Sequence, residues 1–275
     1  MQNTNVIQDQ KYFFDLNAQK EEKKVNKNNF FYIYNTEIIY SGFNWLSDRK
    51  KIIDYGCGTG KNIEMFLDNT NDKSKSFIGV DISDEAIKKA KEKFTEKQYN
   101  FIKISNNKIP QIADMGTDGA YMICVLHHSH EHQAIFNEIY KKLKKNGKFY
   151  IVDLTADNII VNFARNAFTI LPKKFRNSFS DDLVVDGKIP EKYVVNINSV
   201  VQQLKQTGFE IQGIDKSELF LFIASWVEKF VPISCNDSNL YCKLLRKCHQ
   251  LEKKMLKINY FNKRAHVFSI KCIKK

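Results

Sequence analysis

Residues 52–60 read Ile-Ile-Asp-Tyr-Gly-Cys-Gly-Thr-Gly, and this stretch decides the fold. Two β-branched residues lead into Asp54, and three glycines then follow two positions apart, at Gly56, Gly58 and Gly60. The pattern predicts a buried strand that ends in a tight turn, because glycine accepts a positive φ and lets a ligand approach the main chain. The next residues, 61–67, predict a helix whose first N–H groups would face that ligand and favour an anionic group.

A second strand is predicted at 77–80, and it ends in Asp81, 21 residues after Gly60. A carboxylate about 20 residues beyond a glycine turn can accept hydrogen bonds from the two hydroxyls of a ribose. A chance glycine turn in an α/β protein is the alternative, and the flanking strand, the helix and the spacing of Asp81 weigh against it. The two strands therefore predict half of a nucleoside-binding site.

The spacing of the glycines discriminates between nucleoside cofactors. A dinucleotide-binding turn has the pattern Gly-x-Gly-x-x-Gly, whereas residues 54–60 have Asp-x-Gly-x-Gly-x-Gly. Residues 51–60 resemble the first motif of class I S-adenosylmethionine-dependent methyltransferases, and residues 80–83 resemble the second. The resemblance spans about residues 45–155 and resumes at 198–215 and 265–273. It implies S-adenosylmethionine as the cofactor.

The order of the predicted elements agrees with that family. Strands alternating with helices at this spacing imply a parallel sheet with right-handed crossovers, and ligands bind such sheets at the carboxyl ends of the strands. The expected fold is α/β, with a doubly wound, mostly parallel, seven-stranded sheet, an antiparallel last strand and helical insertions. The later elements are strands at 99–104, 119–124, 149–153, from 209 and at 266–272, and helices at 131–144, 159–171 and 199–206.

The length of 275 residues suits one domain with insertions. No stretch suits a signal peptide or a membrane-spanning helix, and the six cysteines include no Cys-x-x-Cys pair, so we expect a cytoplasmic protein. The expected parts are an N-terminal segment with a cofactor-covering helix at 1–46, a methyltransferase core at 47–216 and 263–275, a lid insertion at 155–197, and a hydrophobic and basic helical insertion at 217–262.

The resemblance assigns cofactor contacts to the ends of the first two strands. Asp54 would orient the methionine end, Asp81 would hold the ribose hydroxyls and Ile82 would lie against the adenine. The cofactor would lie over the three glycines of the turn, Gly56, Gly58 and Gly60.

Two further contacts are assigned to the third and fourth strands. The family often has an acid after the third strand that meets the adenine amino group, and this chain has Ser105 and Asn106 there. A hydroxyl or amide oxygen can accept the same hydrogen bond. Ile123, at the end of the fourth strand, would contribute backbone contacts.

Four histidines occur within residues 127–132. Some quinone O-methyltransferases hold a divalent metal here with Glu-x-x-Glu-His, but Cys124 and His127 replace the two glutamates and only His128 matches, so we assign no metal. Either histidine could instead act as a general base, or the pair could form a structural turn. Asp153, which ends the fifth strand, could orient a nucleophile or cap its turn. The catalytic candidates are therefore His128, His127 and Asp153.

Positive charge is concentrated at the C-terminal end. Residues 241–275 hold eleven Lys and Arg against one acid, a net +10 of the total +12. A predicted helix there carries an apolar stripe, and an apolar segment at 219–227 precedes it. A solvated lid helix, adsorption to an anionic membrane through 217–262, and nucleic-acid binding are the three interpretations. Nucleic acid is disfavoured, because the Asn/Asp-Pro-Pro-Tyr signature is absent after the fourth strand and no RNA-binding module is recognisable.

The sequence thus predicts an S-adenosylmethionine-dependent methyltransferase that moves a methyl group to an oxygen, nitrogen or carbon of a small or lipid-like acceptor. An NAD-dependent oxidoreductase and a non-catalytic nucleoside-binding module on the same fold are the alternatives. The sequence predicts neither the acceptor nor the oligomeric state.

Overall fold

The computed structural model describes residues 11–12, 14–16, 18–19, 30–155, 195–221 and 240–275. The helix predicted at 159–171 and most of the predicted lid insertion lie outside these residues.

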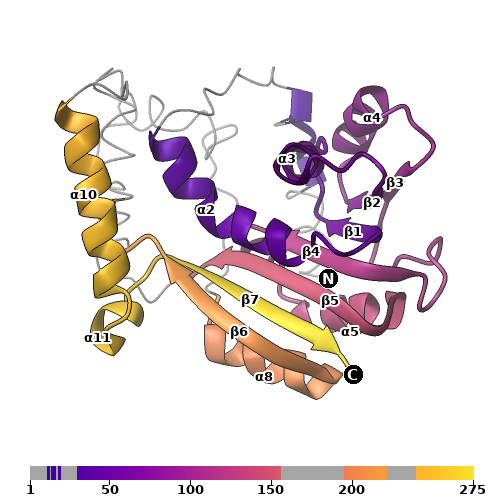
Figure 1. Ribbon diagram of the computed structural model, residues 1–275. Coiled ribbons are helices and arrows are strands. Elements are labelled where there is room, and N and C mark those ends of the chain that lie inside the picture. The colour runs from indigo at the N-terminus through magenta and orange to yellow at the C-terminus, as the bar shows by residue number, and fades with distance from the viewer. Residues whose placement is uncertain (1–10, 13, 17, 20–29, 156–194, 222–239) are drawn as a thin grey trace.

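A seven-stranded sheet with the order β3-β2-β1-β4-β5-β7-β6 forms the centre of the molecule (Figure 1). The five strands from β3 to β5 pair in parallel, whereas β7 runs antiparallel to both β5 and β6. This confirms the doubly wound sheet with an antiparallel last strand. The strands are β1 (Lys51–Tyr55), β2 (Ser76–Asp81), β3 (Tyr99–Lys103), β4 (Thr117–Ile123), β5 (Leu143–Leu154), β6 (Phe209–Ser217) and β7 (Val267–Lys274).

Helices cover both faces of the sheet (Figure 1). One core cluster joins the strands to α5 and α8, and a second joins them to α2, α3 and α4. The chain leaves β1 toward β2 on one side and returns to β4 on the other, so the strand order reverses beside β1, where ligands bind in such sheets. The helical elements are α2 (Phe30–Trp45), α3 (Lys61–Thr70), α4 (Asp84–Lys93), η1 (Leu126–His128), α5 (His132–Lys142), α8 (Ile197–Thr207), α10 (Leu240–Met255) and α11 (Asn259–Asn262).

The boundary between α5 and β5 lies earlier than predicted. The helix ends at Lys142 instead of Lys144, and the strand begins at Leu143 instead of Phe149. Leu143 is fully buried and already pairs with Thr117 of β4, and the register then shifts before Gly119. Burial of one leucine therefore overrides the helix-forming lysines that follow it.

The C-terminal helix α10 forms as predicted, but the leucines of its apolar stripe face solvent and a different side of the helix is buried. Its buried residues are Cys242, Leu245 and Glu252, whereas Leu240 is 81% exposed. No helix among the described residues is long and apolar enough to cross a membrane. Cys242 is disulfide-bonded, a covalent link that the cysteine spacing did not predict.

Candidate functional site

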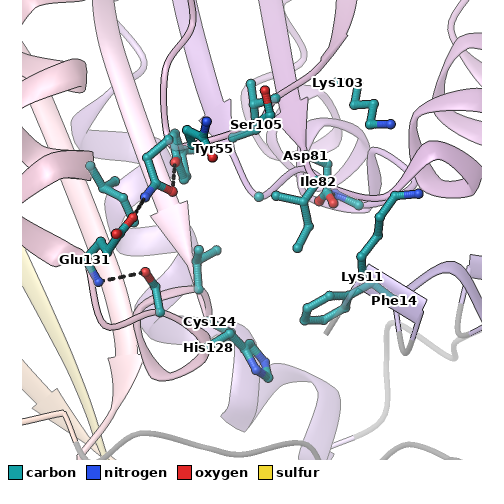
Figure 2. Close-up of a pocket in the computed structure, with 18 of the residues that line it drawn as sticks. Lys11, Phe14, Tyr55, Asp81, Ile82, Lys103, Ser105, Cys124, His128 and Glu131 are labelled. Carbon is teal, nitrogen blue, oxygen red and sulfur yellow. Dashed lines mark hydrogen bonds between the residues drawn. The ribbon is translucent and has the colours of Figure 1, made fainter. Parts of the chain in front are cut away.

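A cavity of about 500 Å³ opens at the carboxyl ends of β1, β2, β3 and β4 (Figure 2). Eight of the site residues selected from the sequence line it: Gly56, Gly58, Asp81, Ile82, Ser105, Asn106, Ile123 and His128. The other four, Asp54, Gly60, His127 and Asp153, are not among its lining residues. The structure thus brings most of the predicted contacts to one place and separates the buried acids from them.

The turn after β1 depends on its glycines for different reasons. Gly56, Gly58 and Gly60 all have a positive φ, of 78°, 53° and 84°. A Cβ on Gly56 would lie 2.4 Å from a methyl of Val125, and one on Gly60 would lie 2.6 Å from the Phe94 ring. A Cβ on Gly58 would meet no atom within 4 Å. The outer glycines therefore permit close packing, and the middle one leaves room beside the cavity.

Asp81 joins this turn to the start of α4. Its Oδ2 accepts a hydrogen bond from the Gly58 N–H at 2.8 Å, and its Oδ1 accepts one from the Ser83 N–H at 2.9 Å. Burial raises the pKa of Asp81, and these backbone donors offset part of that effect. Because a carboxylate oxygen can accept more than one hydrogen bond, both oxygens retain capacity for hydroxyl groups in the cavity.

Asp54 lies within the sheet and is fully buried. Neither carboxylate oxygen makes a well-formed hydrogen bond. Burial raises the pKa of Asp54 to about 8, the Tyr121 hydroxyl lowers it in part, and the charge of Asp81 raises it further. Asp54 does not line the cavity, so its expected effect on the methionine end of the cofactor would have to be indirect, through the backbone of the glycine turn.

The wall of the cavity opposite Asp81 contains polar residues that sequence reasoning missed. The Tyr55 hydroxyl donates to Asn107 Oδ1 at 3.1 Å, and Asn107 Nδ2 donates to Glu131 Oε2 at 2.5 Å. Figure 2 shows this chain across the cavity from Asp81. Asn106 and Asn107 have a positive φ, of 54° and 57°. The Asn-Asn pair was the available signal, because asparagine tolerates this conformation better than most residues.

The histidines after β4 separate into two roles. His127 Nδ1 lies 2.6 Å from Asp153 Oδ1, both side chains are buried, and Asp153 Oδ2 accepts the Leu126 N–H at 2.7 Å. His132 Nε2 lies 2.8 Å from the Leu126 carbonyl oxygen. These contacts hold the turn η1, and they account for His127 and Asp153 without a substrate.

His128, by contrast, lines the cavity and meets the Phe14 ring edge-on at 5.0 Å. Cys124 lines the same wall with a positive φ of 58°. Among the described residues, no three His, Cys, Asp or Glu side chains are grouped to hold a metal ion.

The described residues that cover the cavity belong to the first part of the N-terminal segment predicted at 1–46. Lys11 and Phe14 line it, whereas no residue of α2 does. Lys11 Nζ lies 2.7 Å from Asp84, and the Ser83 hydroxyl donates to Asp15 at 2.6 Å, so the segment is tied to the start of α4. Helix α2 instead contacts α3 and β5. The three consecutive aromatic residues at 12–14, in a largely polar stretch, were the signal for this cover.

The methyltransferase domain family matches residues 46–263 of the chain. No curated protein matches the chain in sequence. Magnesium protoporphyrin IX methyltransferase from Synechocystis PCC 6803, solved with bound SAH, superposes with a TM-score of 0.58 at 12% identity, over 98% of this chain and 99% of that one.

Two other solved structures have the same fold. An S-adenosylmethionine-dependent methyltransferase from Archaeoglobus fulgidus gives a TM-score of 0.53 at 17% identity, over 90% of this chain and all of that one (100%). The cyclase SpnF also gives 0.53, at 14% identity, over 86% of this chain and 81% of that one. At such identities, similarity shows the fold alone, which supports more than one reaction.

Proposed function

Because the chain belongs to the S-adenosylmethionine-dependent methyltransferase family, we propose that it transfers a methyl group to a small, largely apolar or lipid-like acceptor. The cavity at the carboxyl ends of β1 to β4 would hold the cofactor and the acceptor together. The nicotinamide alternative is not favoured, since both the glycine spacing and the family match disagree with it.

The observation that carries the proposal is the placement of Asp81. Its carboxylate lines the cavity, is fixed by the N–H groups of Gly58 and Ser83, and has accepting capacity left on both oxygens. A ribose offers two neighbouring hydroxyls that match two carboxylate oxygens. Ile82 lies next to it in the lining and could cover one face of an adenine. The residues present therefore fit the nucleoside half of S-adenosylmethionine.

The chemistry divides between the cofactor and the protein. When bound, S-adenosylmethionine supplies a methyl group on an already activated sulfonium. The protein has to align the acceptor with that methyl group and exclude water. Phe14 and the segment tied to α4 by Lys11 lie over the cavity, where they would limit the access of water.

An acceptor that must lose a proton needs a base, and His128 is the residue we assign to that role. It lines the cavity beside Phe14, whereas His127 is buried against Asp153. An imidazole can take a proton from a hydroxyl or an amine at neutral pH. The hydrophobic side chains of Phe14, Val125 and Ile135 in the same wall favour an apolar acceptor beside it.

A thermal-shift experiment tests the cofactor assignment. S-adenosylhomocysteine should raise the melting temperature, and NAD and NADP should not. Asp81→Ala should lose the shift, because it removes the ribose acceptor, whereas Asp118→Ala, which changes a half-buried acid at the opposite edge of the sheet, should keep it. An unchanged shift in Asp81→Ala would refute the ribose assignment, and binding without turnover of any acceptor would favour the non-catalytic alternative.

A further inference from the structure

The outer face of α10 carries three exposed leucines, which we name the leucine stripe. Leu240, Leu244 and Leu251 are 81%, 57% and 54% exposed. Spacings of four and seven residues place them on one side of a helix with 3.6 residues per turn. The opposite side is the one that contacts the protein. An apolar face is therefore presented to solvent by a helix that is already anchored.

Exposed apolar side chains gather in this part of the described structure. Of the nine large hydrophobic residues that are exposed, five lie between positions 240 and 260. Ile258 and Tyr260, which follow α10, are 54% and 61% exposed. Single exposed apolar residues need no explanation, but a contiguous group of them marks an interaction surface.

Lysines follow the leucines at a regular spacing. Lys243, Lys247 and Lys254 each come three residues after one leucine of the stripe, so they lie along one flank of it. All three are exposed, and none forms an ion pair with another described residue. Helix α10 itself holds five Lys and Arg against one acid, the buried Glu252, so the surface beside this flank is both apolar and basic.

The inner face of α10 holds the stripe in position. Glu252 accepts hydrogen bonds from the Tyr34 hydroxyl at 2.7 Å and from the N–H groups of Phe220 and Leu221 at 2.9 and 3.0 Å. Leu245, on the same inner face, is buried in a hydrophobic cluster with Tyr34 and Leu221. The orientation of α10 is thus fixed by a buried carboxylate, and its leucines cannot turn inward without breaking these bonds.

We propose that this face of α10 binds the surface of an anionic lipid bilayer. Leucines of the stripe would enter the boundary between headgroups and acyl chains, and the lysine flank would meet the anionic headgroups. Nucleic acid would satisfy the lysines but would leave the leucines in water. A second copy of the chain would bring two strongly basic faces together, which like charges disfavour.

The surface lies at the same edge of the sheet as the cavity. Because β7 is antiparallel to both β5 and β6, β6 runs in the direction of the other strands and Ser217 is a carboxyl end, as Asp81 is. Residues 220 and 221, which follow β6, are bonded to α10, and Figure 1 shows α10 beyond the ends of β6 and β7. A lipid-like acceptor could then reach the cavity from the bilayer, a step that rests on the proposed function.

The apolar segment predicted at 219–227 has a different role in its described part. Leu219 and Leu221 are 4% and 5% exposed, and Leu221 belongs to the cluster beneath α10. These residues do not enter a membrane. The exposed apolar surface comes instead from the outer face of the helix that they support.

Flotation of the full chain with lipid vesicles tests the proposal. The protein should float with vesicles of phosphatidylcholine and phosphatidylserine at 7:3 and remain at the bottom with pure phosphatidylcholine. The triple variant Leu240→Ser, Leu244→Ser, Leu251→Ser should lower the partition coefficient by at least ~tenfold, since it removes the inserted apolar surface. The triple variant Lys243→Gln, Lys247→Gln, Lys254→Gln should lower it ~100-fold, at about 1 kcal/mol for each lysine near an anionic surface.

A matched charge control uses three exposed lysines at the opposite edge of the sheet, Lys144, Lys145 and Lys205, each changed to Gln. It should bind vesicles almost as the wild type does. All variants should keep the S-adenosylhomocysteine thermal shift, which shows that they are folded and separates this test from that of the proposed function. No binding by the wild type, or equal losses in the control and the α10 lysine variant, would overturn the proposal. Unchanged vesicle binding by the leucine variant, or binding of a single-stranded oligonucleotide in place of vesicles, would also overturn it.

Discussion

Two carboxylates, Asp81 and Glu252, are anchored alike at opposite ends of the same sheet edge. Each accepts hydrogen bonds from two backbone N–H groups, those of Gly58 and Ser83 for Asp81 and those of Phe220 and Leu221 for Glu252. Asp81 lines the cavity, whereas Glu252 lies in a closed cluster and is only 1% exposed. The same local chemistry therefore serves two different purposes.

The distinction lies in what fills the remaining capacity of each carboxylate. On Glu252, Oε2 accepts both N–H groups and Oε1 accepts the Tyr34 hydroxyl, so the protein itself occupies both oxygens. On Asp81, each oxygen accepts one N–H in these bonds and faces a cavity. A carboxylate held by backbone donors is thus structural when protein groups also take up its remaining hydrogen-bond capacity. It is a candidate binding group when that capacity faces a cavity.

The largest effect that this comparison predicts is on stability. Glu252→Ala should lower the free energy of unfolding by about 3 kcal/mol, because it leaves two backbone N–H groups and a buried hydroxyl without their acceptor. Urea unfolding measures the change. The dissociation constant for S-adenosylhomocysteine should stay within ~threefold of the wild-type value, since Glu252 is not part of the cavity wall.

Glu210→Ala is the matched control for this variant, because Glu210 is an exposed acid on β6 that pairs with Lys275. Its unfolding midpoint should be that of the wild type. A stability loss for Glu252→Ala no larger than that of the control would show that the buried cluster does not hold α10.

A smaller effect on stability is expected at Asp153, whose surroundings are more like those of Glu252 than like those of Asp81. It accepts hydrogen bonds from the Leu126 and Leu154 N–H groups and contacts His127 Nδ1. Asp153→Asn should lower the free energy of unfolding by about 2 kcal/mol, because the amide nitrogen cannot accept what the lost oxygen accepted. The rate of methyl transfer from S-adenosylmethionine should be lowered by Asp153→Asn no more than it is lowered by His127→Gln. A loss of kcat well beyond that of His127→Gln, at unchanged stability, would restore the catalytic role that the sequence suggested.

The backbone of the half of the sheet edge beside β1 and β2 could be predicted from the sequence, although Asp54 and Gly60 do not line the cavity. Its information is local: a glycine needed for a positive φ, a strand that ends in an acid and a serine that caps a helix all occur within residues 52–83. Each is a short-range constraint on the backbone. Gly56, Gly58, Asp81 and Ile82 accordingly lie where the sequence placed them.

The other elements of the site depend on contacts between distant residues. Phe14 reaches His128 across more than a hundred positions, and Tyr34 reaches Glu252 across 218. The periodicity of α10 predicted a helix with an apolar stripe but could not show which face is buried. Glu252 holds the opposite face inward, because turning the leucines inward would leave the Tyr34 hydroxyl and two backbone N–H groups without their acceptor.

The smallest predicted effect concerns Glu218, which adjoins the Glu252 cluster. Burial, with a smaller contribution from the charge of Glu252, raises the pKa of Glu218 to about 8 from an ordinary value of 4.5. The unfolded chain then releases this proton near pH 4.5, while the folded chain keeps it until about pH 8. Folding stability from this group is therefore full below pH 4.5 and declines as the pH rises to about 8. Glu218→Gln should leave the free energy of unfolding nearly unchanged at pH 4.5 and raise it by ~1 kcal/mol at pH 8.5, after allowance for the side chain's partial exposure. Urea unfolding of both proteins at the two pH values measures the difference, in which the similar contribution of Asp54 cancels. An equal gain at both pH values would mean that Glu218 titrates normally and that the charge of Glu252 does not raise its pKa.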